Sequence, residues 1–257
     1  MERRTDTPKT AQKVFEEALY APLFPPWKSM ILERDSLLDY RQRPVSPNIS
    51  VAELYHENSK LFPEMLSELT ATHSPPAEIR REFLRRRARE VDSLPDEAPL
   101  PAPWRELLQG ISRTISGELF YAVELRLVAG GSLAGFEPVG CRLSVIKELP
   151  PSDQETLGRA LRLLEPPGVL ADAGPVLFIL GCFARNELLF GARGYRRTLL
   201  EAGRVAAEIC RLAQGLDLPV AAIYEFADRA VDTVLESDGT EEGTLMALAM
   251  GGVSTVG

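Results

Sequence analysis

The longest uninterrupted helical pattern runs from Tyr195 to Leu216, where only Gly203 and the terminal Gly215 lower helix propensity. Its charged residues recur every three or four positions and alternate in sign: Glu201, Arg204, Glu208 and Arg211. This spacing places them in one narrow polar stripe, while almost all other positions are apolar or small. A helix that is apolar over most of its circumference packs in a core, so we predict a central helix about 30 Å long. Ala202, Gly203 and Ala206 leave room for another backbone to approach closely.

Runs of β-forming residues separated by glycine and proline signals predict a sheet in the C-terminal two thirds of the chain. We predict strands at 119–129, 135–139, 142–148, 174–183, 219–224 and 244–250. Gly130 and Gly131 mark a hairpin turn after the first of these strands. The run at 174–183 is apolar almost throughout, which predicts a central strand covered on both faces.

The remaining helical patterns are shorter and are separated by prolines. We predict helices at 10–20, from Ser50 onward, and at 77–91, 104–110, 153–164 and 228–235. Ser152 and Glu155 have capping-box spacing at the start of the helix at 153–164. Strands mixed with long helices indicate an α+β fold. A proline-rich stretch at 95–103 divides the chain into a helical N-terminal extension, 1–94, which includes the basic helix, and a main domain, 95–257.

Composition narrows the functional classes. The chain has 257 residues, 45% of them hydrophobic and 26% charged, and a formal net charge of −8, which argues against nucleic acid or an acidic membrane as the main partner. Three cysteines without metal-ligand spacing indicate reduced, buried thiols. The N-terminus has no signal-peptide pattern and no stretch approaches 18 uncharged apolar residues, so we expect a soluble, cytoplasmic protein.

Five segments carry motifs that occur in a defined order. They are LYHENSK (54–60), RRRAR (85–89), ISGELFYAVE (115–124), GARGYR followed by LEAG (191–203), and the stretch from LDLP to the final LAMG (216–251). This ordered set resembles the flavin-dependent SagB-type dehydrogenases, a branch of the nitroreductase superfamily that oxidises azolines to azoles in modified peptides. Each motif alone is unspecific, but together they cover roughly residues 50–251.

The resemblance implies an antiparallel sheet wrapped by helices and a dimer with FMN at the subunit interface. The helix at 195–216 would then be the dimer-interface helix, and we expect Ala206→Arg to disrupt the oligomer. The expected partners are a second copy or another nitroreductase-fold chain, together with a modified peptide or its synthetase complex.

The resemblance also points to cofactor-binding residues. Arg85, Arg86 and Arg89 match the family positions that neutralise the flavin phosphate and the electron-rich edge of its ring. The alternative is a solvated basic helix face, in which Arg80, Arg81 and Arg87 are balanced by Glu78, Glu82 and Glu90. Ser116 and Tyr121 also match the family pattern. Arg193 and Arg196 would bind phosphate at a helix start, or else serve in capping and charge pairing.

Other family positions have changed. Family members have glycine where this chain has Glu118, Tyr224 and Glu225, and only glycine lets backbone approach the flavin ring closely. Active relatives carry a Lys-Tyr pair directly before GxRGYR, where this chain has Leu189 and Phe190. Neither side chain can exchange the proton that azoline oxidation must move. We therefore assign no catalytic residue and no metal ligand, and we expect the chain alone to bind FMN weakly or not at all.

Three interpretations remain. The first is a degenerate SagB-type subunit, non-catalytic or partner-dependent, in a thiazole- or oxazole-forming complex. The second is an active FMN-dependent azoline dehydrogenase, acting on a ribosomal or nonribosomal peptide with a base from elsewhere. The third is a binding role for small ligands in the vacated pocket. No hydrolase triad, Walker motif or metal-spaced cluster offers another chemistry, and the only histidines are His56 and His73.

Overall fold

The computed structural model describes residues 76–91, 100, 102–161, 174–191 and 193–250. It contains one six-stranded sheet with the strand order β3-β2-β1-β4-β6-β5, in which every neighbouring pair is antiparallel. The strands are β1 (Val123–Ala129), β2 (Ser132–Glu137), β3 (Arg142–Glu148), β4 (Val176–Cys182), β5 (Val220–Ile223) and β6 (Glu242–Met250). The predicted α+β class and antiparallel sheet are confirmed, and so are the central apolar strand and the hairpin at Gly130 and Gly131, both of which have positive φ.

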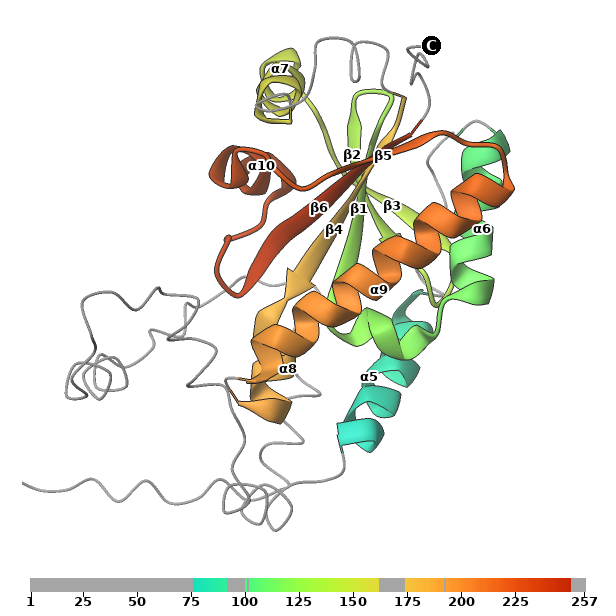
Figure 1. Cartoon of the computed structure of the whole chain (residues 1–257), viewed down its shortest axis with the longest axis vertical. Coiled ribbons are helices and arrows are strands. Elements are labelled where there is room, and N and C mark those ends of the chain that lie inside the picture. The colour runs from blue at the N-terminus through green and yellow to red at the C-terminus, as the bar shows by residue number, and fades with distance from the viewer. Residues whose placement is uncertain (1–75, 92–99, 101, 162–173, 192, 251–257) are drawn as a thin grey trace, which may run out of the picture.

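Helices cover both faces of the sheet (Figure 1). They are α5 (Pro76–Val91), α6 (Ala102–Thr114), α7 (Pro151–Ala160), α8 (Phe183–Phe190), α9 (Arg193–Gly215) and α10 (Asp228–Leu235), with a 3₁₀ turn, η1 (Gly117–Tyr121), before β1. The predicted helices at 77–91, 195–216 and 228–235 are confirmed. The helices predicted at 10–20 and from Ser50, together with most of the proline-rich connector, lie outside the described residues.

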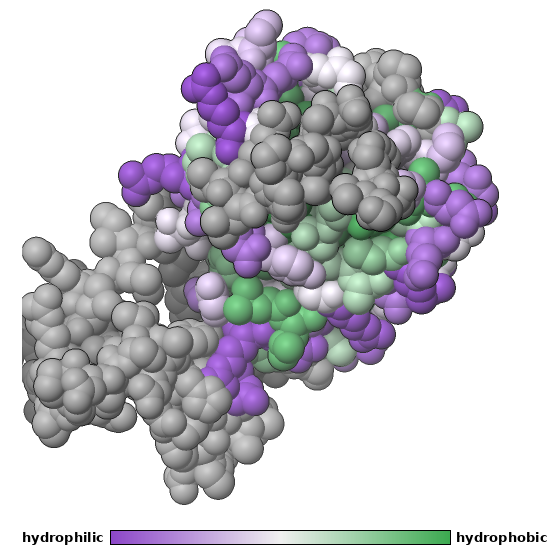
Figure 2. All heavy atoms as spheres, turned by 45° about the horizontal axis from the view of Figure 1, so that its top comes forward, coloured by the Kyte–Doolittle hydropathy of each residue, from purple (hydrophilic) through white to green (hydrophobic). Residues whose placement is uncertain are grey.

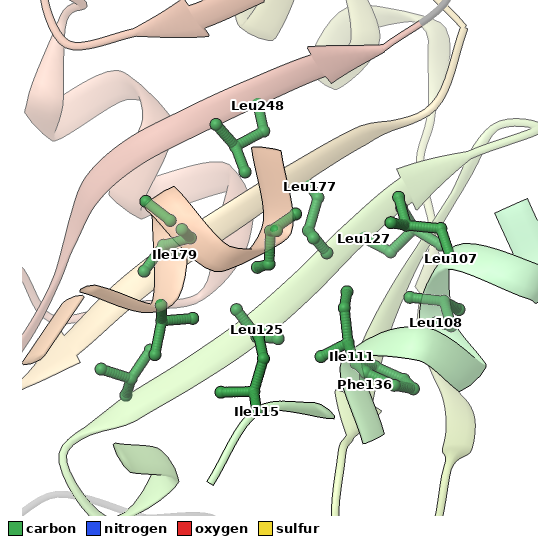
Figure 3. Packing of buried hydrophobic residues seen from close by; sticks show 14 of the residues in the cluster. Leu107, Leu108, Ile111, Ile115, Leu125, Leu127, Phe136, Leu177, Ile179 and Leu248 are labelled. Atoms are coloured by element: carbon green, nitrogen blue, oxygen red, sulfur yellow. The ribbon is translucent and has the colours of Figure 1, made fainter. Parts of the chain in front are cut away.

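The sheet has a hydrophobic core on each face, and alternate residues of the central strand β4 point into one core or the other. Leu177 and Ile179 of β4 pack with α6 and α9, whereas Phe178 and Leu180 pack on the opposite face with α7 and α10. The first core is shown in Figure 3, where α6 supplies Leu107, Leu108 and Ile111 and the strands supply Leu125, Leu127 and Phe136. This alternation follows from the two-residue period of a strand, so both faces of the sheet are apolar and covered.

Several local predictions are wrong in detail. The strand expected at 135–139 is β2, which begins at Ser132 and ends at Glu137. The pattern at 119–129 begins as η1, and β1 starts only at Val123. The helix expected at 104–110 extends over Ala102–Thr114. Helix α7 begins at Pro151, with Pro150 as N-cap and no side-chain cap, so the capping box of Ser152 and Glu155 does not form. The apolar run predicted as strand up to residue 183 ends at Cys182, and α8 follows it directly.

Hydrophilic side chains occupy much of the described surface, and hydrophobic ones form a patch near the middle of the view in Figure 2. Among the described helices, none combines the length and the hydropathy that crossing a bilayer requires.

Candidate functional site

Two arginines of helix α5 point into the protein interior. Arg80 and Arg87 lie seven residues apart on the same face as Ile79 and Phe83, and all four side chains are buried. Arg81, Arg85 and the rest of the outward face remain accessible to solvent. The interpretation of Arg80 and Arg87 as part of a solvated basic face is therefore wrong.

Arg87 pairs with two glutamates that lie far away in the sequence. Its Nη1 donates to Glu124 Oε1 at 2.9 Å, and its Nε donates to Glu137 Oε2. Glu124 is the second residue of β1 and Glu137 is the last residue of β2. Arg87 therefore connects α5 to the end of the β1–β2 hairpin. Arg185 of α8 adds a second cation, with its Nη1 2.7 Å from Glu124 Oε1.

The charges in this cluster compensate one another. Burial disfavours ionised Glu124, but Arg87 and Arg185 outweigh that effect and lower the pKa of this carboxyl to about 2. Burial also opposes the charge of Arg87, yet Glu124 and Glu137 raise the pKa of its guanidinium above its ordinary value. Burial outweighs the attraction of Arg87 at Glu137 and raises the pKa of that carboxyl. Glu124 is thus held ionised as the shared counter-ion of two arginines.

Arg80 forms a second buried network between α5, α8 and α9. Its Nη2 donates to Glu201 Oε1 at 2.7 Å and to Asn186 Oδ1 at 2.9 Å. Asn186 in turn donates from Nδ2 to Thr198 Oγ1 and to Glu201 Oε2, each at 3.1 Å. Glu201, predicted on the polar stripe of α9, is only 8% exposed and belongs to this network.

The positions of the family's Lys-Tyr pair lie at the end of α8, beside this network. Leu189 is buried in an apolar cluster with Ile79, Phe83 and Tyr121. Two guanidinium groups lie near the Phe190 ring, with the Cζ atoms of Arg197 and Arg80 at 4.5 and 5.8 Å from its centroid. Such contacts stabilise an aromatic ring without a hydroxyl group.

Tyr121 is fully buried. Its hydroxyl donates to the backbone oxygen of Arg185 at 3.1 Å, and burial raises the pKa of this phenol to about 12. Its ring meets the Phe83 ring edge-on at 5.1 Å. Tyr121 therefore joins η1 to α8 and α5, and its hydroxyl does not face solvent.

The predicted cofactor-binding residues lie on the outer side of these elements. Arg85 and Arg89 are exposed and Arg86 is half-buried, with Glu82 3.6 Å from both Arg85 and Arg86. Ser116 is exposed as the N-cap of η1. The motif segments 85–89 and 115–124 lie side by side, since Arg87 of the first segment donates to Glu124 of the second at 2.9 Å.

The GARGYR motif has a packing role that its glycine explains. A Cβ at Gly194 would lie 2.3 Å from the backbone of Asn186 and Glu187, so α9 can start against α8 only with glycine there. The ring of Tyr195 stacks on Phe183 at 4.7 Å. Arg193 is exposed and Arg196 is half-buried at this helix start.

The positions where the family has glycine carry outward-facing side chains. Tyr224 is 61% exposed and Glu225 is also exposed, directly after β5, and Glu118 is exposed on η1. In the described part of the chain, no group of three or more histidine, cysteine, aspartate and glutamate residues could hold a metal ion.

Sequence reasoning missed Arg185, Glu124, Glu137 and Glu201 as members of buried networks. The signal available was the seven-residue spacing of Arg80 and Arg87 on the face that also carries Ile79 and Phe83. That spacing indicates inward arginines, but the glutamates that they meet are 37 to 121 residues away in the sequence.

No protein-family model matches this sequence, and a search of the curated proteins finds no match either. Solved structures do match. A candidate nitroreductase from Anabaena variabilis superposes with a TM-score of 0.54 and 21% identity, over 78% of this chain and 46% of that one. This chain therefore spans about half the length of the Anabaena protein.

A chain of the E. coli microcin synthetase McbBCD complex, solved with truncated pro-MccB17 bound, gives a TM-score of 0.51 and 13% identity. The match covers 95% of this chain and 87% of that one. A more distant structure, a candidate nitroreductase from Desulfovibrio desulfuricans in complex with FMN, has a TM-score of 0.39 and 15% identity over 70% of this chain and 87% of that one. The match to the Anabaena protein shows that this chain has the nitroreductase fold.

Proposed function

We propose that this chain is a degenerate nitroreductase-fold subunit of a peptide-modifying, thiazole- or oxazole-forming complex, and that it depends on a partner for catalysis. The similarity to a chain of a microcin synthetase complex over nearly the whole length supports the type of assembly. The order of the sequence motifs supports the SagB-type branch.

The observation that carries the proposal is the environment of Leu189 and Phe190. Removing a carbon-bound proton requires a side chain that can accept it. Leu189 is enclosed in an apolar cluster. Phe190 has an aromatic ring without a hydroxyl group, and this ring lies beside the guanidinium groups of Arg197 and Arg80, so neither side chain can accept a proton. A lysine at 189 would be buried among apolar side chains, so this packing suits the residues that are present and not the family pair.

The residues present also fit an FMN ring poorly. When bound, FMN would accept the hydride from the azoline. Its flat ring needs backbone lined by glycine, whereas Glu118, Tyr224 and Glu225 project exposed side chains at the corresponding positions. Arg85 and Arg89 are still available to a phosphate at the surface of α5, and Ser116 lies on the neighbouring η1. We therefore propose that this chain retains part of a phosphate site and lacks the ring platform.

A heterodimer would explain why some of these residues are kept. In such a pair this chain would complete one site of an active nitroreductase-fold relative and would form none itself. The test is to co-express this chain with such a relative, purify the complex and measure flavin absorbance against protein. We expect one flavin per heterodimer, and we expect activity on an azoline peptide to fall when this chain is omitted.

The isolated chain provides the decisive control. If it contains stoichiometric FMN and oxidises an azoline peptide alone, the proposal is wrong and the chain is an FMN-dependent azoline dehydrogenase. In that case Arg85→Ala or Arg89→Ala would abolish the activity, whereas Arg81→Ala, an exposed position on the same helix, would not.

A further inference from the structure

We propose that the groove between α6 and the C-terminal end of α9 binds a short acidic segment of the peptide to be modified. The groove has a volume of about 720 Å³, which lies in the range of sites that hold ligands. This inference deepens the proposed function and rests on it, because it names what a non-catalytic subunit would hold.

The floor of the groove is formed where the two helices touch. A Cβ at Gly110 of α6 would lie 3.6 Å from the Leu212 side chain of α9, which is an ordinary van der Waals distance, so the two helices pack closely at this point. Leu100, Leu212 and Leu216 line the same groove and are only partly buried against the main core. They offer apolar contact to a bound side chain.

The walls of the groove carry an excess of positive charge. Among the described residues that line it, Arg105, Arg113 and Arg211 are basic and Glu106 is the one acidic residue. Arg211 pairs with Glu208 at 3.0 Å on the exposed surface. Arg105 and Arg113 lie eight residues apart on α6, and within the described residues neither has an ion pair or a side-chain hydrogen bond.

These charges select the occupant. The whole chain has a net charge of −8, so a basic groove is a local exception that attracts a short acidic segment, whereas the overall charge repels a long polyanion such as a nucleic acid. A small inorganic anion would leave the three leucines unused. An extended peptide that alternates carboxylates with apolar side chains uses both the arginines and the leucines.

The probe is a fluorescein-labelled hexapeptide of alternating glutamate and leucine, titrated with the full chain and followed by fluorescence anisotropy. We expect saturable binding that weakens as salt is raised, because exposed charges are screened. The same peptide with glutamine in place of glutamate should bind at least about tenfold more weakly. Arg105→Glu combined with Arg113→Glu should reduce the affinity for the acidic peptide by a similar factor.

A matched variant controls for net charge. Arg81→Glu combined with Arg229→Glu makes the same change at exposed positions outside the groove and should leave the affinity unchanged. Circular dichroism establishes that both variants are folded. The inference is overturned if the acidic peptide does not bind, or if both double variants weaken it equally. It is also overturned if the groove variant alone changes the oligomeric mass, because the groove would then hold a second copy. None of these outcomes depends on the flavin content of the heterodimer. The peptide-binding experiment therefore tests this inference, and the flavin measurement tests the proposed function.

Discussion

Arg80 of α5 and Glu201 of α9 form a buried ion pair across 121 positions of sequence, with Nη2 and Oε1 2.7 Å apart. The side chains are 5% and 10% exposed, and Asn186 hydrogen-bonds to both. The pair therefore anchors the arginine-rich helix to the central helix.

Removing Arg80 should destabilise the protein strongly. Arg80→Met removes the buried cation of Glu201 and leaves Arg197, whose side chain is 46% exposed and whose Nε lies 2.9 Å from Oε1, as its remaining partner, so we expect a loss of up to about 3 kcal/mol in the free energy of unfolding. Arg81→Met changes an exposed neighbour on the same helix and should cost no more than about 0.5 kcal/mol. Urea unfolding followed by circular dichroism measures both. Equal losses in the two variants would contradict the role of the pair.

The pH dependence of stability should report on Glu124. Its pKa is lowered from 4.5 to about 2 in the folded protein, so its charged form contributes stability above about pH 4.5, and this contribution is lost as the pH falls toward 2. Glu137 has a raised pKa and opposes this trend in part. In Glu124→Gln the free energy of unfolding should depend less on pH between 3 and 5, by at most about 1.4 kcal/mol per pH unit.

An uncharged core variant provides the comparison for Glu124→Gln. Leu107→Ala removes a fully buried side chain and should lower the stability by about 2 to 5 kcal/mol at every pH, with the pH slope of the parent. A parental slope in Glu124→Gln would show that other groups cause the acid sensitivity.

Two glycines of α9 should respond in opposite ways to alanine. At Gly194 the new Cβ would meet the Asn186 backbone at 2.3 Å, which only a shift of α8 against α9 can relieve, so we expect a loss of more than about 3 kcal/mol. At Gly203 nothing lies within 4 Å, and Gly203→Ala should stabilise the helix by up to about 1 kcal/mol. Thermal unfolding of the two variants tests this, and a tolerated Gly194→Ala would refute the close helix packing.

Elements with a strong local pattern could be predicted from the sequence. The apolar run that became β4, the glycine pair of the hairpin and the amphipathic helix α10 each carry their own signal. Helix α8 was missed because its eight residues, FARNELLF, follow the strand directly without a breaker or a cap. Residues Leu119 to Tyr121 are β-forming, yet they coil into η1, where Tyr121 packs against Phe83.

The candidate site was less predictable than the fold. The motifs located the relevant segments, and the structure places 85–89 beside 115–124 through the hydrogen bond of Arg87 with Glu124. The motifs could not show which arginines of α5 point into the protein. Arg87 is held inside by hydrogen bonds to Glu124 and Glu137, which belong to other elements and not to its own helix. Whether Arg85, Arg86, Arg89, Ser116, Arg193 and Arg196 bind a cofactor remains a prediction.

The prediction that the chain dimerises through α9 needs a different variant from Ala206→Arg. Ala202 and Ala206 are buried against the sheet of their own subunit, so an arginine at 206 would disrupt folding rather than association.

The outward face of α9 presents Leu200, which is 75% exposed, beside Gly203 and Ala207, which are also exposed. If this face meets a partner, Leu200→Arg should convert a dimer to a monomer without lowering the melting temperature of the subunit, because it introduces a charge into an apolar contact and removes nothing from the core. Light scattering measures the mass, and Thr233→Arg on the exposed side of α10 should leave it unchanged. A dimer that persists in Leu200→Arg would show that the subunits meet elsewhere, and a monomeric parent chain at high concentration would leave a heterologous partner as the occupant of this face.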